Sequence, residues 1–137
     1  MATIHTEYTG QLRTVATHLQ SGNTIITDAP VDNQGKGEAF SPTDLLAASL
    51  GSCMITIMGI AAQTHGFNID GTKADITKIM ASNPRRVGEI KIDLYFPDVE
   101  YSPKEKKLIE AAAFSCPVYL SLHPDLIKSI NLHFQHQ

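Results

Sequence analysis

The feature that most constrains this chain is a long run without charge. The segment SPTDLLAASLGSCMITIMGIAAQTHG spans residues 41–66, and residues 45–63 within it carry no charged side chain. Its start combines Ser41, Pro42 and Asp44: a side-chain cap, a proline at the first helical position and an acid in the first turn. Such a helix is roughly 38 Å long, whereas a compact chain of this size has a radius of gyration of roughly 14 Å. We therefore expect one helix that crosses the whole domain.

Apolar side chains lie on every side of this predicted helix, so we expect it to be buried all round. The run also approaches the length of a membrane span. Against a span, neither flank carries Lys or Arg, and small or polar residues interrupt the run at Ser49, Gly51, Ser52, Thr56, Gly59 and Gln63. We predict a soluble core helix and no membrane partner. One sheet can cover one side of it, and a second copy of the chain is the economical cover for the other, which predicts a homodimer.

The rest of the chain predicts strands and one further helix. Two-residue alternation between turn signals predicts strands at residues 4–9, 12–20, 23–27, 72–81, 88–96 and 127–134. Ser102, Pro103 and Glu105 form a capping box that starts the second helix. Pro117 should end that helix near Cys116 and start a short new turn. The fold class is therefore α+β, as one domain over residues 1–137.

Composition narrows the partners and the compartment. Lys and Arg number 11 against 14 Asp and Glu, a net charge of −3 without charge blocks, which argues against nucleic acid or an anionic membrane. The opening MATIHTEYTG is polar and alternating, so we expect no signal peptide and a cytoplasmic location. The six histidines lack the spacing of a shared site, and no phosphate-binding loop is present, so we expect no metal and no cofactor.

Two cysteines, Cys53 and Cys116, are too far apart for a Cys-x-x-Cys motif, and buried free cysteines usually act as small hydrophobes. Two features favour chemistry instead. Cys116 lies at a helix break, where the start of the next helix lowers the pKa of a thiol. Cys53 lies in an apolar helix beside the small residues Gly51 and Ser52, which leave room for another group to approach. A reactive Cys53 in such surroundings needs a cation, and Arg13 lies on the apolar face of its strand. From the residues alone, an Arg13 that extends from the rim to water remains the favoured interpretation.

The run SPTDLLAASLGSCM, followed roughly sixty residues later by a second cysteine in AAAFSCPV, resembles the OsmC/Ohr proteins. These are cysteine-dependent peroxide reductases, and the resemblance is closest to their less characterised redox-protein branch. It implies an OsmC-like fold: antiparallel sheets wrapped around a long central helix in an intertwined homodimer. It also implies that Cys53 attacks the peroxide, that Cys116 resolves the product and that Arg13 steadies the thiolate.

The carboxylate that holds this arginine is where the chain departs from the resemblance. Better studied branches carry a glutamate directly after the helix-opening proline, and this chain has Thr43 there. Glu38 and Asp44 are the candidate substitutes. We favour Glu38, because Asp44 already suits the helix N-terminus.

The predicted function is a thiol-dependent peroxidase that reduces organic hydroperoxides, or hydrogen peroxide, through a sulfenic acid on Cys53 that Cys116 resolves. An external thiol would restore the dithiol. Two alternatives stay open. One is a non-catalytic dimer that binds a small ligand, with incidental cysteines. The other is a different nucleophilic chemistry of Cys53, such as acyl transfer.

Overall fold

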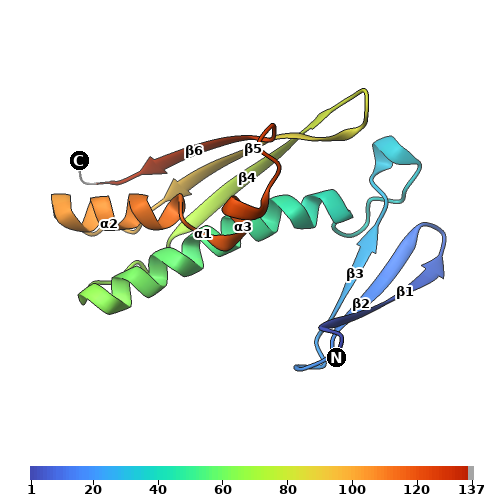
Figure 1. Ribbon diagram of the computed structural model, residues 1–137, viewed down its shortest axis with the longest axis horizontal. Coiled ribbons are helices and arrows are strands. Elements are labelled where there is room, and N and C mark those ends of the chain that lie inside the picture. Colours follow the sequence, from blue (N-terminus) through green and yellow to red (C-terminus); the bar gives the residue numbers. More distant parts are fainter. Residues whose placement is uncertain (136–137) are drawn as a thin grey trace. The chain divides into compact units, whose positions relative to one another are not determined.

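The computed structural model describes residues 1–135, and the chain forms two compact units, Met1–Leu46 and Ala47–Gln137. The first unit contains a three-stranded antiparallel sheet in the order β1-β2-β3 (Figure 1). Its strands are β1 (Ile4–Gly10), β2 (Arg13–His18) and β3 (Thr24–Asp28). The predicted meander is confirmed, with ends that differ by one or two residues. The division into two units leaves the prediction of a single domain as a prediction.

The loop after β3 folds back onto the turn between β1 and β2. It contains the short 3-10 helix η1 (Val31–Asn33). Ala29 donates its N–H to the carbonyl of Leu12 at 3.0 Å and accepts from the N–H of Gly37 at 3.3 Å. A Cβ on Gly35 would collide with the carbonyl of Ala29, so only glycine permits this close approach.

Helix α1 (Pro42–His65) starts at the predicted residue, and its first turn shows why. The Ser41 hydroxyl accepts the N–H of Asp44 at 3.0 Å, and the Asp44 carboxylate accepts the N–H of Ser41 at 2.9 Å. This reciprocal pair satisfies two backbone donors that the helix cannot satisfy itself.

Only one side of α1 is buried within the chain. Its buried residues recur every three or four positions, at Ala47, Leu50, Gly51, Met54, Met58 and Ala62. Among the other large apolar residues of the helix, Leu46 and Ile60 are exposed, and 54% of Ile60 is exposed. Burial on all sides is therefore not met within one chain, and the predicted second copy stays a prediction. By length and composition α1 is able to cross a membrane, a property that the core helix of a soluble protein shares.

The second unit contains a three-stranded sheet in the order β4-β5-β6, formed by β4 (Lys73–Ala81), β5 (Arg86–Tyr95) and β6 (Ile127–His133). Strands β4 and β5 are antiparallel, but β5 and β6 are parallel. The expectation of purely antiparallel sheets is wrong for this pair. The chain between them contains α2 (Pro103–Ala113) and α3 (Pro117–Ser121), a connection long enough for a parallel crossover.

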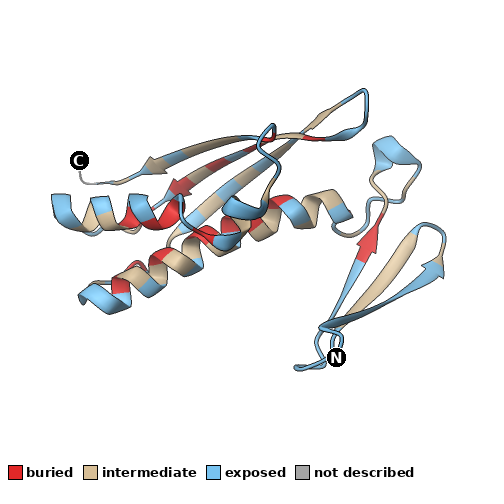
Figure 2. Cartoon of the chain, in the orientation of Figure 1, coloured by how far each residue is buried: buried red, intermediate tan, exposed pale blue. Residues whose placement is uncertain are grey.

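One face of this sheet forms the core with the helices, as the burial colours of Figure 2 show. The inward residues of β5 and just beyond it are those that the alternation predicts: Ile90, Ile92, Leu94 and Phe96. Gly51 of α1 lies against the Ile76 side chain of β4, so the missing side chain lets helix and sheet approach closely. The second helix begins with the predicted capping box between Ser102 and Glu105. The α+β class is confirmed.

Candidate functional site

Cys53 lies midway along α1, and its side chain is partly exposed. The residue next to it, Met54, points fully into the core, and Cys53 packs against the edge of the same apolar cluster. A rigid helix therefore holds the sulfur at the boundary between core and surface. The side of α1 that the neighbouring Gly51 occupies is already filled by the sheet.

Cys116 lies between two helices, as the sequence predicts. Helix α2 ends at Ala113, and Pro117 is the first residue of α3. Cys116 is the N-cap of α3: its Sγ accepts a hydrogen bond from the N–H of Tyr119 at 3.3 Å. The side chain is fully buried.

The two thiols are in contact. Burial raises the pKa of the Cys116 thiol above its usual value, and a hydrogen bond between the Cys116 and Cys53 side chains raises it further. The N–H of Tyr119 acts in the opposite direction, but burial is the larger effect. The predicted lowering at the helix start is therefore wrong for Cys116. Both cysteines are free, so the structure brings two distant residues together as a dithiol.

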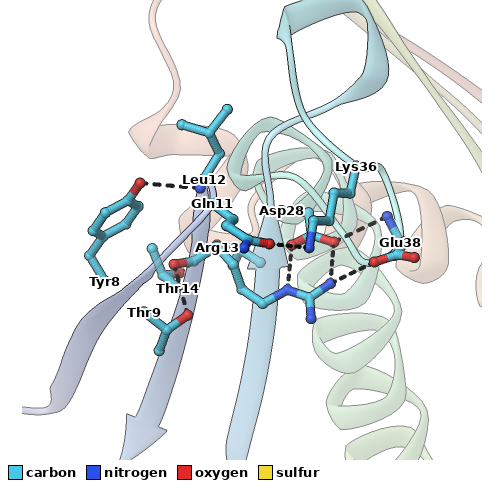
Figure 3. Close-up of polar contacts among 10 residues, drawn as sticks. Tyr8, Thr9, Gln11, Leu12, Arg13, Thr14, Asp28, Lys36 and Glu38 are labelled. Carbon is cyan, nitrogen blue, oxygen red and sulfur yellow. Dashed lines mark hydrogen bonds and ion pairs between the residues drawn. The ribbon is translucent and has the colours of Figure 1, made fainter.

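A second polar cluster lies in the first unit, around Arg13 (Figure 3). Its Nε donates to Oδ1 of Asp28 at 2.7 Å, and its Nη2 donates to Oδ2 of Asp28 at 2.8 Å. Nη2 also donates to Oε1 of Glu38 at 3.1 Å. The guanidinium therefore contacts two carboxylates, and the interpretation of Arg13 as a simple rim residue is wrong.

Asp28 is the site residue that sequence reasoning missed. It is the register partner of Arg13 across β2 and β3, and only 1% of it is exposed. The hydrogen bond from Arg13 holds the pKa of Asp28 below its ordinary value, and the same bond raises the pKa of Arg13. Pairing the residues of β2 and β3 outward from the Ser21-Gly22 turn places Asp28 within a few positions of Arg13, which is the signal in the sequence.

The structure distinguishes Glu38 from Asp44, the two candidates to replace the carboxylate expected where this chain has Thr43. Glu38 contacts Arg13 directly, whereas Asp44 caps α1 through Ser41. The Thr43 hydroxyl lies 3.1 Å from that of Ser41, within the same helix start. Of the predicted site residues, Cys53 contacts Cys116 in the second unit, and Arg13 contacts Glu38 in the first. Within residues 1–135, no three His, Cys, Asp or Glu side chains gather in a way that would hold a metal ion.

Comparison with known proteins identifies the relatives of this chain. The profile of the OsmC-like protein family matches residues 35–129, more than half of the sequence. The chain belongs to the OsmC-like family. The matched range includes Glu38, Cys53 and Cys116, while Arg13 and Asp28 precede it. A comparison with curated protein sequences gives no match.

Solved structures agree with the OsmC-like fold. A proposed osmotic stress induced and detoxification response protein from Psychrobacter arcticus is 55% identical, with a TM-score of 0.92 over 97% of this chain and 96% of that one. The organic hydroperoxide resistance protein OsmC of Legionella pneumophila is 13% identical, with a TM-score of 0.74 over 96% and 97%. The organic hydroperoxide resistance protein OhrB of Bacillus subtilis is 15% identical, with a TM-score of 0.69 over 97% and 98%. The two distant likenesses show the shared fold alone, and the OsmC/Ohr membership and fold expected from the sequence are confirmed.

Proposed function

We propose that this OsmC-like protein is a thiol-dependent peroxidase that reduces organic hydroperoxides through Cys53. The observation that carries the proposal is the contact between two free thiols, Cys53 and Cys116. Thiols in contact are poised to form a disulfide once one of them is oxidised. Family membership supports the proposal, and so do the names of two structural neighbours, which are called organic hydroperoxide resistance proteins.

The different surroundings of the two cysteines support a division of roles. Cys53 is partly exposed, so a peroxide can reach its sulfur. Cys116 is fully buried, and burial raises the pKa of its thiol, which favours the protonated form. Since the thiolate is the nucleophile, Cys53 suits the attack and Cys116 the later resolution.

The proposed reaction balances with one hydroperoxide and two thiols. The Cys53 thiolate attacks the terminal oxygen, the O–O bond breaks, and the alkoxide takes up a proton and leaves as alcohol. Cys53 is now a sulfenic acid. The Cys116 thiol attacks its sulfur, a disulfide forms and water leaves. An external dithiol then reduces the disulfide by exchange. The apolar cluster beside Cys53 suits the alkyl group of an organic hydroperoxide better than hydrogen peroxide.

In this proposal Arg13 and Glu38 take part in the reaction of Cys53. The guanidinium would stabilise the thiolate and the negative charge on the departing oxygen. The protein works as a single-domain homodimer, in which a second copy covers the open side of α1. The exposure of Ile60 on that side supports the dimer. A cytoplasmic location stays a prediction.

The test counts free thiols before and after one equivalent of cumene hydroperoxide. We expect the wild type to lose both thiols and Cys53→Ser to consume no peroxide. Cys116→Ser should stop at a Cys53 sulfenic acid, which dimedone traps. Peroxide consumption at the wild-type rate by Cys53→Ser contradicts the proposal. Thiols that survive the peroxide would favour a binding protein, and an acyl adduct on Cys53 would favour acyl transfer.

A further inference from the structure

Asp28 has an unusual environment for an acidic side chain. It is the one charged residue that is buried within residues 1–135, with 1% of its surface exposed. Burial of a carboxylate is unfavourable unless hydrogen bonds and an opposite charge compensate for it. Here the hydrogen bonds that compensate come from the Arg13 guanidinium and the backbone N–H of Glu38, two residues of the proposed site, and the charge of Lys36 adds to them.

The contacts of Asp28 link these two residues. Its two oxygens accept from Nε and Nη2 of Arg13, at 2.7 and 2.8 Å, in the parallel arrangement that fixes the plane of a guanidinium. Oδ2 also accepts the backbone N–H of Glu38 at 3.1 Å. The same carboxylate therefore orients Arg13 and anchors the loop that carries Glu38.

Glu38 contacts Arg13 in a different manner. It provides one oxygen to Nη2 at 3.1 Å, and 64% of its side chain is exposed. A single exposed contact of this kind contributes little and is readily exchanged. Figure 3 shows the guanidinium in contact with both acids, with Asp28 on the strand and Glu38 on the loop.

We infer that Asp28 is the positioning residue of the site, and that the Glu38 carboxylate is the exchangeable partner of Arg13. Asp28 holds the guanidinium plane through Nε and Nη2, and the oxygen of Glu38 marks the place on Nη2 where a negatively charged oxygen is held. During the reaction, the oxygen that leaves the hydroperoxide replaces the Glu38 carboxylate there. This inference rests on the proposed function, in which Arg13 stabilises the charges of the Cys53 reaction.

A role of Asp28 that acts through Arg13 and a purely structural role predict different effects of Asp28 substitutions. If Asp28 acts through Arg13, its removal matters only while Arg13 can form the paired contact. Arg13→Lys keeps the positive charge but cannot form two parallel bonds to one carboxylate. Asp28→Asn should therefore lower the rate of Cys53 oxidation about 10- to 100-fold in the wild type, as expected for a misplaced catalytic group. On the Arg13→Lys background, Asp28→Asn should lower the same rate less than about twofold, because the effects of two residues that act through one contact do not add.

The experiment measures cumene hydroperoxide consumption by the full chain for Asp28→Asn, Arg13→Lys and the double variant, with Cys53→Ser alongside. Glu7→Gln is the matched control, because it removes one negative charge from an exposed position on the same sheet. We expect it to stay within about twofold of the wild type. If Asp28→Asn does not fold, as judged by circular dichroism, Asp28→Glu replaces it. That variant keeps the buried charge and moves the carboxylate by one methylene, and the same cycle applies.

A second readout follows Arg13 itself. The Nε–H resonance of Arg13 in ¹⁵N spectra should exchange slowly with water in the wild type and in Glu38→Gln, and rapidly in Asp28→Asn. The inference alone is overturned if Asp28→Asn lowers the rate equally in the wild type and in Arg13→Lys. It is also overturned if the Nε–H of Arg13 exchanges rapidly in Glu38→Gln and slowly in Asp28→Asn. Undiminished peroxide consumption by Cys53→Ser overturns the inference and the proposed function together.

Discussion

Arg13 and Asp28 face each other across the β2–β3 ladder and are joined by two parallel hydrogen bonds, at 2.7 and 2.8 Å. Such paired contacts between a guanidinium and a carboxylate are stronger and more directional than single ones. Because Arg13 favours the ionised form, the pKa of Asp28 lies below its ordinary value in the folded chain. Folding and the ionisation of Asp28 are therefore linked.

The first prediction concerns pH. A carboxylate whose pKa falls on folding contributes stability above its unfolded pKa, and that contribution is lost as the pH falls through the folded pKa. The wild type should therefore exceed Asp28→Asn in stability near neutral pH, and the gap should narrow toward about pH 3, below the ordinary pKa of an aspartate side chain. Urea denaturation of both proteins across this range measures the gap. A gap that stays constant with pH would contradict the role of the Asp28 charge.

The second prediction concerns the two thiols. Cys53 is partly exposed, whereas Cys116 is buried and burial raises the pKa of its thiol. Iodoacetamide should therefore modify Cys53 faster than Cys116 in the folded protein, by on the order of tenfold or more, because only the accessible thiolate reacts. Mass spectrometry of peptides from a time course measures both rates. In urea, where both side chains are exposed, the rates should converge; preferential labelling of Cys116 in the folded protein would contradict the assigned environments.

The third prediction concerns the cap of α3. Cys116 Sγ accepts the N–H of Tyr119, and serine can provide the same acceptor whereas alanine cannot. Cys116→Ser should be more stable than Cys116→Ala by about 1 kcal/mol, the usual value of such a cap. Both variants lack the same thiol, so each serves as the control for the other in urea denaturation. Equal stabilities would show that the sulfur does not act as a cap.

The fourth prediction compares two glycines of α1. Replacing a helical glycine by alanine stabilises a helix by about 0.5–1 kcal/mol. At Gly59 nothing lies within 4 Å of the added Cβ, so the chain itself allows this gain. At Gly51 the new methyl group collides with Ile76, and overpacking costs about 1–3 kcal/mol.

Gly51→Ala should therefore be less stable than Gly59→Ala, as measured by urea denaturation at one protein concentration. The reverse order would mean that the open side of α1 is packed more tightly than its sheet side.

Local signals predicted the elements of this fold well. The alternation that places Ile90, Ile92 and Leu94 inward is a property of the strand alone, and the cap of Ser102 depends on three neighbouring residues. Such features need no knowledge of distant parts of the chain. The uncharged run likewise predicted the long helix, because a segment of that length without charge has few other stable environments.

Non-local features were the ones that the sequence could not provide. The parallel pairing of β5 and β6 depends on how the connection through α2 and α3 crosses the sheet. The position of Asp28 opposite Arg13 depends on the register of β2 and β3, which the Ser21-Gly22 turn sets only to within a few residues. The pKa of Cys116 was predicted in the wrong direction, since burial outweighs the helix start and burial is decided by packing.

The cap of α3 has a consequence for the whole dithiol. The atom that caps this helix is the sulfur that contacts Cys53, and the residues of α3 itself, such as Val118 and Tyr119, are only partly buried against the core. Any modification that weakens Cys116 Sγ as an acceptor must loosen the helix start. The coupling is reciprocal: a ligand or subunit that loosens α3 must shift the equilibrium of that modification of Cys116 by the same factor. Binding at the surface of α3 and the oxidation state of the buried Cys116 sulfur are therefore thermodynamically coupled.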